Sequence, residues 1–199
     1  MIDPTQLPTD LPAPVDDGAA SHLPTLAMPP LAFLSTAGTT VQLNELGDGR
    51  TVLYLYPMTG RPGEALPDGW DAIPGARGCT PESCAFRDHH AALLAAGAAA
   101  VYGLSSQSTD EQVEAATRLH LPFPLLSDPG LQLADALRLP TFAAGGQTRY
   151  RRLTLIVTAG RIEHVFYPIF PPDAHAADVL RWLRDRDRAG AAGRAAATP

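Results

Sequence analysis

The sequence predicts a single α/β domain in which a mixed β-sheet carries helices on both faces. Segments typical of strands and helices follow one another in the order β, α, β, α, β, α, β, β, α, and such alternation is characteristic of a layered α/β fold. The chain has 199 residues, of which 45% are hydrophobic and 18% charged. This length and composition are sufficient for one domain with a full core.

Both ends of the chain differ in composition from its middle. Residues 1–25 combine proline, aspartate and threonine with few large apolar side chains, so burial there cannot offset the entropy lost on ordering. We therefore expect a flexible N-terminal tail. The small-residue stretch 187–199 predicts a second flexible tail, which leaves residues 26–186 as the folded domain.

Strand signals dominate the first part of this domain. Residues 31–46, "LAFLSTAGTTVQLNEL", predict two short strands around a turn at 36–39. "RTVLYLYP" is β-branched and aromatic, as expected of a buried central strand, and Pro57 ends it. Residues 58–78 are rich in glycine and proline without a regular period, which predicts a long loop.

A helix is predicted directly after this loop. Thr80 is a suitable N-cap, Pro81 fits the first helical position, and Glu82 favours the positive end of the helix dipole. Gly97 marks the C-terminal end.

Strands and helices continue to alternate up to the C-terminal helix. The predicted segments are a strand in 98–106, a helix in 109–119, a short strand in 123–128, a short helix in 131–137, a β-hairpin formed by 152–158 and 161–168, and a final amphipathic helix capped by Asp173 and ending near Arg186.

Charge and hydropathy argue against two classes of partner. The net charge is −6, so we expect no nucleic acid partner. The N-terminus lacks a basic stretch followed by an apolar one, and no apolar run is long enough to cross a bilayer. We therefore expect a cytoplasmic protein without a membrane partner.

The two cysteines, Cys79 and Cys84, stand at the start of the first helix, and three kinds of site are compatible with them. A zinc site could use His89 and His90, but structural zinc sites usually need a second ligand pair elsewhere. A passive disulfide closing so short a loop would add little stability. In a redox site, Cys79 would lie at the positive end of the helix dipole, which favours the thiolate.

Several stretches of the chain are similar to one family. "GCTPESCAFRD", residues 78–88, resembles the "GCT-x-E-x-C-x-(F/L)-R-D" segment of the bacterioferritin-comigratory-protein or PrxQ class of peroxiredoxins. "RRLTLIV…GRIEHVF" resembles their later hairpin, and "LYLYP" and "LPFPLLSD" also fit. The resemblance runs from about Ala27 to Arg184. It implies a thioredoxin-like fold and a thiol peroxidase that needs no metal or organic cofactor.

The resemblance also implies roles for individual residues. Cys79 matches the peroxidatic cysteine, Cys84 the resolving cysteine, Arg152 the active-site arginine, and Glu82 a carboxylate behind it. Peroxide would convert Cys79 to a sulfenic acid, which would condense with Cys84 to an intramolecular disulfide. Thioredoxin or a similar dithiol reductant would then reduce this disulfide. We expect a monomer or a weak dimer.

The match has one departure. In the family, a threonine three residues before the peroxidatic cysteine bonds the thiolate and the peroxide, but Ala76 stands at that position here. The family proline lies seven residues before the cysteine, whereas Pro57 lies 22 residues before Cys79, which implies an insertion of about 15 residues. Thr59 is our candidate for the missing hydroxyl.

Two other functions compete with a peroxidase acting on hydrogen peroxide and organic hydroperoxides. The first is a thioredoxin-like thiol–disulfide oxidoreductase, although such enzymes normally carry Cys-x-x-Cys, which this chain lacks. The second is a zinc-binding structural module, which would contain bound metal.

Overall fold

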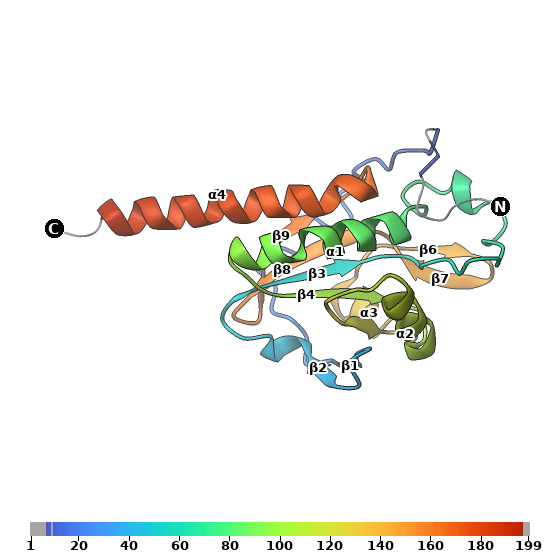
Figure 1. Cartoon of the computed structure of the whole chain (residues 1–199), viewed down its shortest axis with the longest axis horizontal. Helices are drawn as coiled ribbons and strands as arrows, with labels where there is room; N and C mark the ends of the chain where they lie inside the picture. Colours follow the sequence, from blue (N-terminus) through green and yellow to red (C-terminus); the bar gives the residue numbers. More distant parts are fainter. Residues whose placement is uncertain (1–6, 9, 197–199) are drawn as a thin grey trace.

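The computed structural model describes residues 7, 8 and 10–196, and the side chains of this part up to Ala189. Its centre is a five-stranded mixed sheet (Figure 1). In spatial order, the strands are β5 (Leu125–Ser127), β4 (Ala98–Ser105), β3 (Arg50–Leu55), β8 (Leu153–Thr158) and β9 (Arg161–Phe166). β3, β4 and β5 are parallel, while β8 and β9 run antiparallel to their neighbours. The predicted mixed sheet is confirmed.

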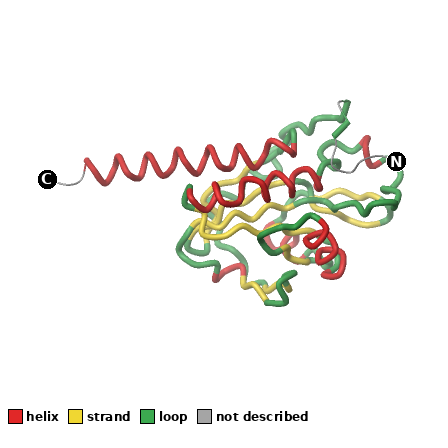
Figure 2. The backbone as a smooth tube through the Cα atoms, in the orientation of Figure 1, coloured by secondary structure: helices red, strands yellow, loops and turns green. Residues whose placement is uncertain are grey.

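Helices cover both faces of this sheet, as predicted (Figures 1 and 2). α1 (Cys79–Ala95) and α4 (His175–Ala196) share one hydrophobic cluster with the even-numbered side chains of β3. α3 (Gln132–Leu137) packs on the opposite face, against the odd-numbered side chains of β3. α2 (Thr109–Arg118) lies beside β5, and Ser108 and Glu111 form a capping box at its start.

Two small hairpins and three 3₁₀ turns complete the fold. The hairpins are β1 (Ala32–Leu34) with β2 (Thr40–Gln42), and β6 (Thr141–Ala144) with β7 (Gln147–Tyr150); the 3₁₀ turns are η1 (Leu43–Glu45), η2 (Trp70–Ala72) and η3 (Pro172–Ala174). The β6–β7 hairpin was not predicted, because alanine and glycine are weak strand formers. Its signal is Gly145–Gly146, whose positive φ angles suit a tight hairpin turn.

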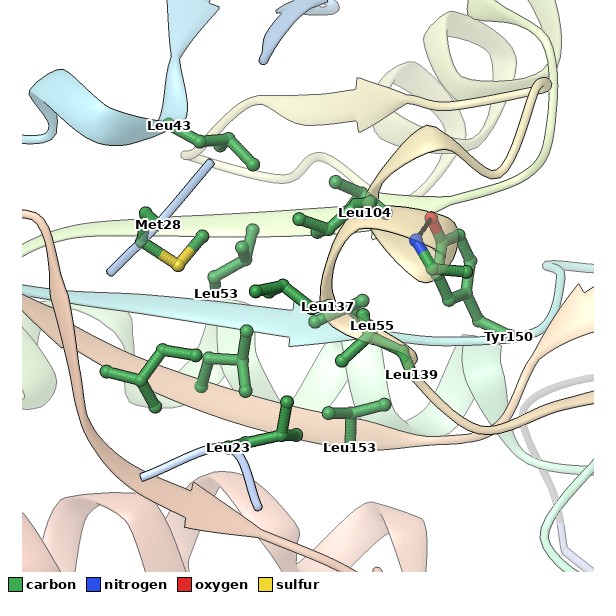
Figure 3. Close-up of a cluster of buried hydrophobic side chains, with 14 of the residues drawn as sticks. Leu23, Met28, Leu43, Leu53, Leu55, Leu104, Leu137, Leu139, Tyr150 and Leu153 are labelled. Atoms are coloured by element: carbon green, nitrogen blue, oxygen red, sulfur yellow. Dashed lines mark hydrogen bonds between the residues drawn. The ribbon is translucent and has the colours of Figure 1, made fainter. Parts of the chain in front are cut away.

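The N-terminal segment contributes to the core. Leu23 is fully buried and Ala20 is nearly so, and both belong to the cluster that contains Leu53 and Leu155 of the sheet. Figure 3 shows Leu23 and Met28 beside side chains from the strands. The prediction of a flexible tail through residue 25 is therefore wrong for its last part. Residues 1–6 and residue 9 of this predicted tail lie outside the described residues.

The C-terminal region also differs from expectation. α4 continues to Ala196, ten residues beyond its predicted end at Arg186, and residues 197–199 lie outside the described part. The alanines that suggested a loose tail have the highest helix propensity and extend the helix instead. Asp173 lies in η3, so it does not cap α4 directly. No helix in the described part of the chain is both long and apolar enough to span a membrane.

The burial of Leu23 predicts its contribution to stability. Leu23→Ala should lower the free energy of unfolding by about 2–5 kcal/mol, because it leaves a cavity in the core. Val15→Ala is the control, since Val15 is 81% exposed, and it should change stability by less than about 0.5 kcal/mol. Urea denaturation measures both changes. Equal effects of the two substitutions would show that the N-terminal segment is not packed in solution.

Candidate functional site

The first turn of α1 places Cys79 at the boundary between the long loop and the helix. Gly78 has φ = +102°, which favours glycine, and a Cβ there would collide with the ring of Pro172. The helix therefore begins at Cys79, two residues earlier than predicted, and Thr80 is its second residue rather than its N-cap. Cys79 is only 3% exposed.

A buried arginine connects this turn with the sheet. Arg152 immediately precedes β8, and its Nη2 donates to the Sγ of Cys79 at 3.2 Å and to the carbonyl of Arg77 at 3.2 Å. Its Nη1 donates to Oε2 of Glu82, one turn into α1. Three of the residues singled out in the sequence, Cys79, Glu82 and Arg152, are therefore brought together, and all are buried.

The ionisation of Cys79 reflects opposing influences. Burial raises the pKa of the Cys79 thiol, and the nearby Glu82 carboxylate raises it further. The positive charge of the Arg152 guanidinium lowers this pKa most, and the nearby backbone N–H of Met58 and the hydrogen bond from Arg152 lower it further. Burial has the largest effect, so the pKa lies above its usual value. The helix dipole alone had suggested the opposite direction, because that argument did not include burial.

Glu82 is also affected by its surroundings. Burial raises the pKa of its carboxyl to about 7, against the opposing charge and hydrogen bond of Arg152. The carboxylate of Glu82 and the thiolate of Cys79 therefore compete for the guanidinium of Arg152. Removal of this guanidinium changes the pKa of both groups.

The position predicted for Thr59 is only partly correct. Thr59 is buried near the site, but its hydroxyl donates to Oε1 of Gln107 at 3.1 Å, and its backbone N–H donates to the same atom at 2.8 Å. Gln107 in turn donates from Nε2 to the carbonyl of Thr59 at 3.2 Å. No hydrogen bond joins Thr59 to Cys79 among the described residues, so the proposed replacement of the family hydroxyl by Thr59 is wrong. The backbone N–H of Met58 lies near the sulfur and lowers the pKa of the Cys79 thiol.

Met58 and Gln107 are the two contributors that sequence reasoning missed. In the parallel pair β3–β4, Leu55 is in register with Leu104. Met58 and Gln107 each lie three residues beyond these positions, so the chain brings them to the same edge of the sheet. The sequence did contain a signal for this position, because Met58 and Gln107 both lie in segments that follow adjacent parallel strands. The contribution of Met58 comes from its backbone N–H, however, and the identity of a side chain does not reveal such a contribution.

Cys84 lies on the same helix as Cys79, but not beside it. Both thiols are free, and Cys84 is half-buried. Residues five apart in an ideal helix have Cα atoms roughly 8.6 Å apart and point to different sides. A disulfide needs Cα atoms less than about 7 Å apart. The two cysteines therefore cannot bond while α1 keeps its first turns.

The loop before α1 encloses a cavity next to Cys79. This cavity has a volume of about 660 Å³. Its wall is formed mainly by the inserted segment, including Met58, Leu66 and Trp70, and it reaches Gly78, Cys79 and Thr80. Residues 58–78 contain no strand or α-helix, and η2 lies within them.

The two adjacent histidines make separate contacts, and neither contact involves a thiol. Nδ1 of His89 bonds to the carbonyl of Ala85 within α1, and the ring of His90 packs on Phe123. Within the described residues, no group of three or more His, Cys, Asp or Glu side chains is placed to hold a metal ion.

Comparison with known proteins gives one consistent family. The redoxin family profile matches residues 19–180. Peroxiredoxin Q from Sedum lineare is 30% identical over 157 residues, which cover 78% of this chain and 75% of the relative. Peroxiredoxin Q from Triticum aestivum is also 30% identical, over 74% of this chain and 60% of its own length.

Solved structures agree with these relatives. Peroxidoxin BcpB from Mycobacterium tuberculosis is 26% identical, with a TM-score of 0.65 over 82% of this chain and 98% of its own. A peroxiredoxin Q from Xanthomonas campestris, 21% identical with a TM-score of 0.60, covers 89% of this chain and 98% of its own and shares the fold.

The contacts of Arg152 predict the effect of removing it. Arg152→Met should raise the pKa of Cys79 further, because the largest lowering influence is lost, and should slow oxidation by peroxide about 10- to 100-fold. Ultraviolet absorbance of the thiolate during a pH titration, in a Cys84→Ser background, measures the pKa.

Removing the cation also leaves Glu82 buried without its partner, which is destabilising. The double variant Arg152→Met, Glu82→Gln is therefore the matched control, because it removes both charges. An unchanged or lowered Cys79 pKa in both variants would contradict the assignment.

Proposed function

The chain belongs to the redoxin family and, within it, to the PrxQ class of peroxiredoxins, which makes it a thiol-dependent peroxidase, and we propose that Cys79 is its peroxidatic cysteine. The observation that carries this proposal is the hydrogen bond from Nη2 of Arg152 to the sulfur of Cys79. A buried guanidinium that touches a cysteine sulfur stabilises the thiolate when it forms. Cys84 does not have this contact with Arg152.

The first chemical step uses the groups around this sulfur. In the resting site, the thiol of Cys79 donates to the carbonyl of Ala76 at 3.6 Å. After deprotonation, the thiolate attacks the terminal oxygen of the peroxide. The S–O bond forms and the O–O bond breaks, so the sulfur is oxidised to a sulfenic acid. The proton lost by the thiol ends on the oxygen that leaves as water or an alcohol.

Arg152 and the N–H of Met58 are placed to assist this step. Arg152 already bonds the sulfur, and the N–H of Met58 lies near enough to lower the pKa of the thiol, so both donors lie close to the place where the peroxide oxygens must be. Donors fixed in a buried site stabilise developing negative charge without the cost of reorganising water. Gln107 acts as a positioning residue, since it holds the backbone of Thr59 next to Met58.

Two further steps restore the thiols. The thiol of Cys84 attacks the sulfenic sulfur, the S–S bond forms, and water leaves. A thioredoxin-type dithiol then reduces the disulfide by thiol–disulfide exchange and is itself oxidised. We also propose that the protein acts as a monomer or weak dimer in the cytoplasm, without nucleic acid or membrane partners. Its net charge of −6 supports the absence of a nucleic acid partner.

The two cysteines should respond differently to substitution. Cys79→Ser should abolish turnover of peroxide, because it removes the nucleophile. Cys84→Ser should allow one rapid oxidation per molecule and leave a sulfenic acid on Cys79, which a dimedone-type reagent labels. Stopped-flow kinetics and mass spectrometry measure these outcomes. Substantial turnover by Cys79→Ser, or a label found elsewhere than Cys79 in Cys84→Ser, would refute the assignment.

Formation of the disulfide requires α1 to unwind at its start, because of the separation derived above. Opening must break the bond between Glu82 and Arg152 and the packing of Gly78 against Pro172. Pro81 makes opening less costly, since it lacks the N–H that a helix residue normally donates.

The redox state should therefore change local protection. In the oxidised protein, amides of residues 76–86 should exchange with solvent faster than in the reduced protein. The central strand β4 is the internal control and should exchange equally in both states. Hydrogen exchange measured by mass spectrometry tests this. The mechanism fails if residues 76–86 are equally protected in both states while the Cys79–Cys84 bond is confirmed.

A further inference from the structure

We propose that Arg149 is a second cation of the active site, whose charge offsets the negative charge that forms on Cys79 and so speeds its reaction with peroxide. This inference rests on the proposed peroxidase function, and it adds a residue that the family resemblance did not indicate. Arg149 lies in β7, three residues before Arg152. Its hydrogen bonds within the described part of the chain do not include the sulfur, so it would act through its charge.

The pairing of β6 with β7 directs Arg149 toward the active site. Arg149 is directly opposite Phe142, and residues opposite each other in an antiparallel pair carry their side chains on the same face. Phe142 packs on a buried cluster that includes Ala76. The carbonyl of Ala76 accepts the bond from Sγ of Cys79 in the resting site. Arg149 therefore lies on the face of the hairpin that packs against the surroundings of the sulfur.

The connection between β4 and α2 joins Arg149 to a second part of the site. Nη1 of Arg149 donates to the hydroxyl of Ser106 at 3.4 Å. Ser106 directly precedes Gln107, whose side chain holds Thr59 next to Met58. Two segments that border the sulfur, the inserted loop and this connection, therefore both lie beside Arg149.

The charge of Arg149 is buried without a carboxylate partner. Arg149 is only 9% exposed, and it belongs to none of the ion pairs in the described part of the chain. Its bonds go to neutral oxygens of Ser106 and Gln147, and its Nε has no partner among the described residues. A buried charge without a partner is costly. A negative charge that forms nearby is therefore stabilised by it.

Two negative groups act on Arg149. Burial lowers the pKa of its guanidinium, while the carboxylate of Glu111 and the thiolate of Cys79 raise it. Glu111 accepts two bonds from Ser108 in the capping box of α2, which ties its carboxylate to the start of that helix. The thiolate, in contrast, is a charge that appears only when the reaction begins.

The charges next to the sulfur do not sum to zero without Arg149. Glu82, when ionised, cancels the charge of Arg152, so the thiolate of Cys79 leaves this buried group with a net charge of −1. Arg149 restores neutrality, which reduces the cost of ionising a buried thiol. Two buried phenols also lie close to the sulfur, and burial raises their pKa so far that they stay uncharged: Tyr54 and Tyr56.

The pKa of Cys79 tests the proposal. It is measured from the ultraviolet absorbance of the thiolate during a pH titration, in a Cys84→Ser background. Arg149→Gln removes the charge but keeps a polar group for Ser106, and it should raise this pKa by about one pH unit. Because the pKa already lies above its usual value, such a rise lowers the thiolate fraction at pH 7 about tenfold. Oxidation by hydrogen peroxide, followed by stopped flow, should slow about tenfold at pH 7 and by less above the pKa.

Two further arginine variants separate charge from structure. Arg149→Lys keeps a cation and should restore most of the lost rate. Arg151→Met is the matched control, because it removes a cation from a residue two positions away in the chain. Arg151 donates to the carbonyl of Thr141 at 3.4 Å and acts on Asp17 instead of the site. Its loss should change the pKa of Cys79 by less than about 0.3.

Glu111→Gln tests the same interaction from α2, even if the Arg149 variants do not fold. Glutamine also suits a capping box, so the substitution keeps the start of α2 and removes the other negative charge that acts on Arg149. The pKa of Cys79 should then fall, because the thiolate no longer shares Arg149 with a carboxylate.

The outcomes separate the two levels of the argument. The role of Arg149 is refuted if Arg149→Gln and Arg151→Met shift the pKa equally, if Arg149→Lys restores nothing, or if Glu111→Gln leaves the pKa of Cys79 unchanged. A folded Arg149→Gln variant that reacts slowly with an unchanged pKa would also refute it, because the residue would then be merely structural. In each of these cases the peroxidase remains. If hydrogen peroxide does not oxidise Cys79 in the unsubstituted protein, the proposed function itself fails.

Discussion

The contact of one buried guanidinium with both a carboxylate and a sulfur organises this structure. Arg152 is 3% exposed and Glu82 is fully buried, and charges in such a place are costly unless they are paired and hydrogen-bonded. Arg152 meets this condition with Glu82, the sulfur of Cys79, and the carbonyls of Gly75, Ala76 and Arg77. The end of the loop, the first turn of α1 and the start of β8 are held together by one side chain.

This arrangement couples chemistry to folding. Glu82 and Cys79 lie in the same turn of α1, so the turn that presents the nucleophile also supplies the partner of the cation. While the turn is formed, both terminal nitrogens of Arg152 have partners and the sulfur is enclosed. When the turn opens to let the cysteines meet, Arg152 must lose Glu82. The ion pair therefore favours the closed, reduced form, and the free energy of the disulfide must exceed that preference.

The sequence was sufficient for the central fold but not for its edges. β3, β4 and β8 were predictable because β-branched and aromatic runs have a clear signal, and the helix at Cys79 was predictable from its glycine, proline and acidic residue. The burial of Leu23 was not predictable, because a single leucine among prolines does not belong to a hydrophobic repeat. Only tertiary packing determines whether such a residue is buried. The helix beyond Arg186 was missed because alanine-rich segments suit both a tail and a helix.

The functional site was likewise only partly predictable from the sequence. Cys79, Glu82 and Arg152 were identified by their resemblance to family positions, and the structure brings them together. Thr59 was assigned a direct hydrogen bond to the sulfur, but Gln107 accepts its hydroxyl. The sequence could not show this, because the pairing of Thr59 with Gln107 depends on β3 and β4 being neighbours. The donor from Met58 is a backbone group, so the residue type at that position says nothing about it.

The two ends of the inserted segment are fixed independently of its middle. Pro57 follows the central strand β3 and Gly78 precedes α1, while the residues between them form a cluster with little share in the cores of the sheet. Loops attached to rigid elements tolerate changes of length and sequence better than those elements do. Mutations in the middle of this segment, residues 60–74, can therefore accumulate without moving the nucleophile or its cation. Evolution can therefore reshape the cavity beside Cys79 and retain the reaction chemistry, because the middle of the segment lines the cavity while its two ends contact the site.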